Sequence, residues 1–107
     1  MTMVTVKTAE LEGAALDWAV DKATGTQWAR PSTEWTQGGP LIESRHVTVD
    51  FNMSAEEDPS YDQEPWISCI GQHSGCYYGA TPLIAAMRAI VAADLGDTVE
   101  IPEELVK

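Results

Sequence analysis

The sequence predicts an α+β fold: one small domain with two helices packed on a small, mostly antiparallel sheet. Two segments, Glu10–Thr24 and the stretch from Pro82 to Leu95, have apolar residues at helical spacing and are each followed by a glycine. Short runs of β-branched residues in alternation lie around them, which is typical of strands. A length of 107 residues leaves room for a single domain, residues 1–107.

The helix that follows Thr81 has the clearest signal. The Thr81 hydroxyl can cap its free amides, and Pro82 suits the first helical position, where no amide hydrogen is needed. An apolar stripe follows and Gly96 ends the helix. The stripe consists of Leu83, Ile84, Met87, Val91 and Leu95.

The first helix is expected over Glu10–Thr24, with Thr8 as its N-cap and Gly25 as its end. Acidic residues near its start and Lys22 near its end suit the helix dipole. Its many alanines predict close packing against a sheet or another helix.

Four short strands complete the expected fold. They cover Met3–Lys7, Val47–Asn52, Trp66–Ile70 and Thr98–Ile101. In the second of them, Val47, Val49 and Phe51 share one face.

The remaining segments are expected to be connectors. In Thr26–Pro40, Ser32 can cap one helical turn, and Gly38-Gly39-Pro40 forces a chain reversal. Connectors of this length are often functional. Residues 53–65 are expected to form a mobile acidic loop, and Gln72–Ala80 a glycine-rich loop.

The formal net charge of −11 limits the classes of partner. A chain with this charge repels nucleic-acid phosphates and anionic lipids, so no direct nucleic-acid or membrane partner is expected. It is attracted to basic protein surfaces. The same excess of acids also serves solubility.

Two cysteines, Cys69 and Cys76, are too few for a disulfide framework, and their spacing fits neither a zinc site nor a redox pair. No signal peptide or membrane span is expected. A cytoplasmic protein with reduced thiols is therefore expected, either a monomer or a homodimer.

No catalytic or metal-binding constellation stands out. His73, Ser74 and Cys76 match no catalytic signature, and the ligands that zinc needs are not clustered. We therefore expect no catalytic residue, no metal and no cofactor.

A binding site for a small nucleotide-like anion is the better-supported hypothesis. Tryptophans can stack a base, Arg30 can meet negative charge, glycines allow close approach of a ligand, and a helix start can receive phosphate. The predicted ligand-binding residues are Trp28, Arg30, Ser32, Thr33, Trp35, Gly38, Gly39, Gly79, Ala80 and Thr81. The competing interpretation is that the tryptophans belong to the core.

The sequence also resembles the NinX-like family of small bacteriophage proteins. The segments that carry the resemblance are Leu11–Val20, Pro31–Glu43 and Tyr78–Ile101. The resemblance implies a temperate-phage or prophage origin and an accessory role outside the virion. It implies no established activity, cofactor or catalytic residue.

Together these features indicate a non-enzymatic phage accessory protein of the host-cell cytoplasm that acts by binding. In the first hypothesis it sequesters a small nucleotide-like host signal and so counters a host defence. In the alternative it inhibits a host protein by covering a basic, nucleic-acid-binding surface. The partner-binding residues would then be Glu56, Glu57, Asp58, Asp62 and Glu64. An enzyme of unrecognised type, centred on His73, is the third hypothesis.

Overall fold

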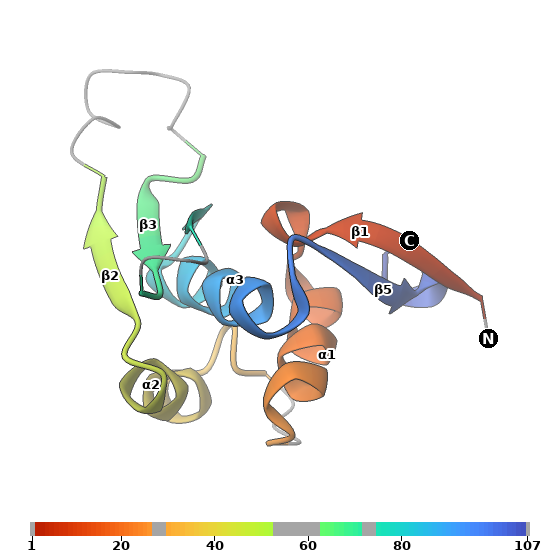
Figure 1. The fold of residues 1–107 in the computed structure, drawn as a ribbon, viewed down its shortest axis with the longest axis horizontal. Helices are drawn as coiled ribbons and strands as arrows, with labels where there is room; N and C mark the ends of the chain where they lie inside the picture. The colour runs from red at the N-terminus through yellow and green to blue at the C-terminus, as the bar shows by residue number, and fades with distance from the viewer. Residues whose placement is uncertain (1, 27–29, 53–62, 72–74, 107) are drawn as a thin grey trace.

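Helix α3 (Pro82–Leu95) runs through the middle of the fold in the computed structural model, which describes residues 2–26, 30–52, 63–71 and 75–106 (Figure 1). Helices α1 and α2 and strands β2, β3 and β4 all contact it. The buried side chains extend around most of the helix rather than along one stripe, and they include Ala85, Ala86, Arg88 and Ala89. A helix that is apolar nearly all round is suited to the interior of a domain.

The predicted ends of α3 are confirmed. The Thr81 hydroxyl oxygen accepts a hydrogen bond of 3.1 Å from the amide of Ile84, and Pro82 occupies the first turn. Gly96 follows the helix with a φ of 98°, a conformation that favours glycine. These signals depend only on neighbouring residues, which explains why the sequence predicts them.

Two small antiparallel sheets flank the helices, so the α+β class is confirmed. Strands β1 (Met3–Lys7) and β5 (Thr98–Pro102) form a pair beside which both chain ends lie (Figure 1). The other sheet has the order β2 (Thr48–Phe51), β3 (Trp66–Cys69), β4 (Cys76–Gly79). Strand β4 was not expected, because glycines surround it in the sequence.

Helix α1 (Gly13–Thr24) begins later than expected. Thr8 does not cap it: Thr8 is buried in a short 3-10 turn, η1 (Thr8–Glu10), and its hydroxyl donates to the carbonyl of Gly96 at 2.7 Å. Glu12 holds the N-cap position instead. The predicted end is confirmed, because Gly25 adopts a left-handed conformation with a φ of 71°.

A third helix, α2 (Trp35–Ser44), corrects the prediction of a connector and chain reversal at Gly38-Gly39-Pro40. The glycines and Pro40 disfavour a helix locally, but tertiary packing outweighs that preference here. Gly38 is buried against α3, where a Cβ atom would lie 2.5 Å from Cδ2 of Leu83. Leu41, one turn on, joins the main core.

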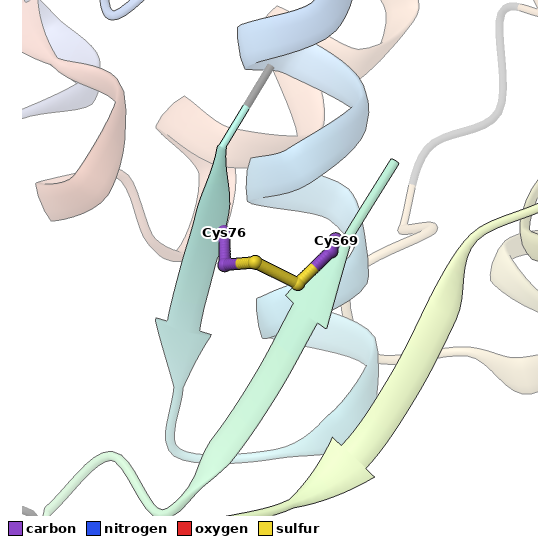
Figure 2. Close-up of a disulfide and its surroundings, with 2 residues drawn as sticks. All are labelled: Cys69 and Cys76. Carbon is purple, nitrogen blue, oxygen red and sulfur yellow. A yellow bond between two sulfur atoms is a disulfide. The ribbon is translucent and has the colours of Figure 1, made fainter. Parts of the chain in front are cut away.

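The two cysteines form a disulfide, which corrects the expectation of reduced thiols. Cys69 and Cys76 are direct partners in the β3–β4 ladder, with Cα atoms 4.3 Å apart (Figure 2). The pairing depends on β4, so it could not be predicted once that strand was missed. Within the described residues, no helix is long and apolar enough to cross a membrane.

Candidate functional site

A hollow of about 180 Å³ lies between the start of α2 and the start of α3. It is lined by Ser32, Thr33, Trp35, Thr81, Leu83 and Ile84. Four of these residues are among the ten predicted for ligand binding, and they come from segments nearly fifty positions apart in the chain. Leu83 and Ile84 were predicted only as part of an apolar helix stripe.

Hydrogen bonds hold the turn that carries Ser32 and Thr33. The Arg30 carbonyl accepts from the amides of Thr33 at 3.1 Å and Glu34 at 2.8 Å. The Ser32 amide donates to Oδ1 of Asp17 at 2.9 Å, and Asp17 is a buried residue of α1. The turn is therefore tied to α1 by the Asp17 carboxylate, and nothing in the residues around Asp17 predicts this role.

Ser32 supplies an unsatisfied polar group. Ser32 is 2% exposed, and its hydroxyl has no hydrogen-bond partner among the described residues. Most buried polar groups in native proteins are paired with protein or with ordered water. The hydroxyl of Ser68 in β3 is also buried and without a partner among the described residues. Ser32 differs from Ser68 in that it lines this hollow, so a molecule bound there is a candidate partner for its hydroxyl.

Trp35 lies at the surface of the same hollow with 57% of its area exposed. It is the first residue of α2, and this exposure excludes the interpretation that it is a core residue. A large exposed aromatic face beside a polar hollow is suited to stacking a flat ring.

The first turn of α3 contributes one backbone donor. The Thr81 hydroxyl oxygen accepts a hydrogen bond from the amide of Ile84, and the Thr81 carbonyl accepts one from the amide of Ala85. Pro82 has no N–H. The amide of Leu83 is then the remaining donor of the first turn by the geometry of a helix. The partial positive charge of a helix start favours an anion in this position.

The predicted glycines have different surroundings. Gly38 and Gly79 both pack against α3, and a Cβ atom at Gly79 would lie 2.5 Å from the backbone nitrogen of Ala85. Their missing side chains thus permit helix and strand packing. Gly39 has no atom within 4 Å of such a Cβ position.

Two other predicted residues are described but are not among those that line the hollow. Arg30 and Ala80 are exposed residues next to its lining segments. Trp28 lies outside the described residues.

The other two arginines belong to the scaffold. Arg45 forms a salt bridge of 2.7 Å with Asp94, which joins the end of α2 to α3, and the hydrogen bond that Arg45 donates to Asp94 raises the pKa of Arg45. Arg88 is 3% exposed and donates to the carbonyls of Leu11 and Tyr78 and to Glu64.

The residues of the two remaining hypotheses are mostly outside the described part of the chain. Glu56, Glu57, Asp58 and Asp62 of the proposed acidic surface lie there, as do His73 and Ser74. Glu64 is described and forms an ion pair with Arg88. Cys76 is in the disulfide, and the described residues contain no group of three or more metal-ligating side chains.

A family model described as Bacteriophage P22, NinX matches residues 26–94. The matched region contains α2, the β2–β3–β4 sheet, almost all of α3, and every residue that lines the hollow. It does not contain the β1–β5 pair or α1, so Leu11–Val20 is outside it. No curated protein matches the chain.

Proposed function

The chain belongs to the NinX family of bacteriophage proteins, and from that premise we propose that it is a phage accessory protein that binds a small nucleotide-like anion in the hollow between α2 and α3. The main support is that Ser32, whose buried hydroxyl has no partner among the described residues, lines a hollow together with the exposed Trp35 and the start of α3.

The size of the hollow restricts how such a ligand binds. Pockets that enclose drug-sized ligands measure about 300–1,000 Å³, whereas this hollow measures about 180 Å³. Only one end of a nucleotide therefore enters it. The rest lies on the surface, where the exposed face of Trp35 can stack the base.

The polar lining indicates which end enters. The Ser32 hydroxyl and the Leu83 amide both donate, and the Thr81 hydroxyl keeps its own hydrogen because its oxygen accepts from Ile84. These three donors suit a phosphate group. The apolar groups of Leu83 and Ile84 form the remaining wall.

The charge of the whole chain works against this ligand at long range. A net charge of −11 repels an anion. Salt at 0.1 M largely screens that repulsion between charges more than about 10 Å apart. Affinity should therefore hold or rise as salt increases. An acidic inhibitor of a basic host protein would show the opposite dependence.

The proposal is tested by calorimetry with three probes: adenosine 5′-monophosphate, adenosine, and inorganic phosphate. We expect the monophosphate to bind more tightly than either part alone. Trp35→Ala should weaken monophosphate binding about tenfold through lost stacking and leave phosphate binding unchanged. Ser32→Ala should weaken monophosphate and phosphate binding while leaving adenosine binding unchanged.

Thr36→Ala, an exposed change next to Trp35, is the matched control and should alter none of the three affinities. The proposal fails if no probe binds saturably at millimolar concentration. It also fails if Trp35→Ala and Ser32→Ala bind the monophosphate as tightly as the unchanged chain. A role in sequestering a host signal applies only to a nucleotide that binds in this way and whose binding both substitutions weaken.

A further inference from the structure

We propose that the Cys69–Cys76 disulfide is an exchangeable modification site, open through Cys76 to small thiols that carry a positive charge. The proposal is independent of the hollow between α2 and α3. It depends on how the bond lies across the β3–β4 ladder and on what borders Cys76.

The disulfide lies on the outer face of its sheet. Ser68, the residue before Cys69, is fully buried, and side chains alternate between the faces of a strand, so Cys69 and Cys76 share the opposite face. Cys76 is exposed and Cys69 is half-buried. Figure 2 shows the bond joining the two strands with α3 behind them.

A second hollow, of about 350 Å³, borders Cys76. Its other lining residues are Ala9, Glu64, Tyr77 and Tyr78. None of these belongs to β2 or β3, so the hollow lies along the edge of β4 that pairs with no strand in the described part of the chain. It is wide enough to admit a small thiol.

The position of this hollow suits attack on one particular sulfur. A thiolate attacks a disulfide sulfur along the line of the S–S bond, from the side opposite the leaving sulfur. For Cys76 that side points away from β3, toward the free edge of β4 and its hollow. The corresponding approach to Cys69 comes from the β2 side of the sheet, and Cys69 is not among the residues that line this hollow.

Reduction of the disulfide takes two exchange steps. The thiolate forms an S–S bond with Sγ of Cys76, the Cys69–Cys76 bond breaks, and its electron pair leaves on Sγ of Cys69, which takes a proton from water. A second thiol molecule then attacks the mixed disulfide. It releases Cys76 as a thiolate and leaves the small thiol as its oxidised dimer, so two thiol molecules reduce one disulfide.

Negative charge beside Cys76 favours reaction with cationic thiols over anionic ones. Glu64 lines the hollow with its side chain 45% exposed, and the chain as a whole carries a charge of −11. Arg88 offsets part of the Glu64 charge through the ion pair, but Arg88 is only 3% exposed, so the carboxylate is the member of the pair that faces solvent. A cationic thiol is therefore concentrated beside Cys76 and an anionic thiol is repelled.

The test uses the full chain, oxidised in air, with cysteamine as the cationic thiol and glutathione as the anionic one at equal thiolate concentration. Samples are quenched in acid, alkylated, and mapped by peptide mass spectrometry. We expect the first adduct on Cys76, and we expect cysteamine to react about fivefold faster than glutathione, as one close charge pair in water allows.

Glu64→Gln keeps an oxygen that can accept from Arg88 but removes the charge, so it should reduce the preference for cysteamine. Glu43→Gln, an exposed change on α2, is the control and should leave the ratio of rates unchanged. A chain that keeps two free thiols in air, a first adduct on Cys69, or a rate ratio that Glu64→Gln does not alter would each overturn the proposal. The readout involves no nucleotide, so its outcome is separate from that of the proposed function.

Discussion

The carboxylate of Asp17 accepts a hydrogen bond of 2.9 Å from the amide of Ser32, and both residues are buried. This contact joins the middle of α1 to the turn that carries two residues of the candidate site, Ser32 and Thr33. Asp17 itself does not line the hollow. It acts as a positioning residue, because it fixes where the turn lies.

We expect Asp17→Ala to lower the free energy of unfolding by about 1–3 kcal/mol, because the Ser32 amide would be left buried without an acceptor. Asp17→Asn retains an oxygen that can accept this bond and should cost less than half as much. Urea denaturation of both variants checks the prediction. Equal losses for Ala and Asn would show that this hydrogen bond does not hold the turn.

Two adjacent glycines of α2 should respond to alanine in opposite directions. A Cβ atom at Gly38 would lie 2.5 Å from Cδ2 of Leu83 and closer still to the carbonyl oxygen of Pro31, whereas one at Gly39 meets no atom within 4 Å. We expect Gly38→Ala to destabilise the fold by about 1–3 kcal/mol through overpacking. Gly39→Ala should stabilise it by about 0.5–1 kcal/mol, since alanine favours a helix interior. Thermal and urea unfolding of the two variants measure both changes in stability. Changes in the same direction would contradict the packing of α2 on α3.

The difference between local signals and distant contacts explains why α3 could be predicted from the sequence and α2 could not. The signals for α3 are local: the Thr81 cap, Pro82 in the first turn, and apolar spacing up to Gly96. The local signals in α2 are unfavourable, and the helix is held by packing on residues far along the chain, such as Gly38 on Leu83.

The candidate site was predictable to a similar extent. Ser32, Thr33, Trp35 and Thr81 were selected for their chemistry, and the structure brings them to one hollow. Asp17 was missed because its role depends on a partner fifteen residues away in the sequence. The disulfide was missed with β4, whose residues pair with a strand instead of forming the expected loop.

Arg88 should be the most costly arginine to replace. It is 3% exposed and donates to the Leu11 carbonyl at 2.7 Å, to the Tyr78 carbonyl at 2.7 Å and to Glu64 at 2.5 Å. We expect Arg88→Met to cost about 3–5 kcal/mol, because these acceptors would lose a buried charged partner. Arg45→Met breaks a partly exposed pair and should cost about 0–1 kcal/mol. Urea unfolding checks both values, and similar losses would show that Arg88 does not hold α3 to its neighbours.

Tyr77 gives the fold a specific sensitivity to alkaline pH. Burial raises the pKa of Tyr77, and the negative charge of Asp97 raises that pKa further. Its phenolate is therefore less favourable in the folded chain than in the unfolded chain, where tyrosine ionises at a pH of about 10. The stability due to this difference is complete below that pH and is lost as pH rises through the folded pKa. We expect unfolding midpoints in urea to fall between pH 9 and pH 11, and Tyr77→Phe to reduce that fall because phenylalanine cannot ionise. Tyr78→Phe, the neighbouring change on β4, is the matched control, and an equal reduction in both variants would contradict the assignment to Tyr77.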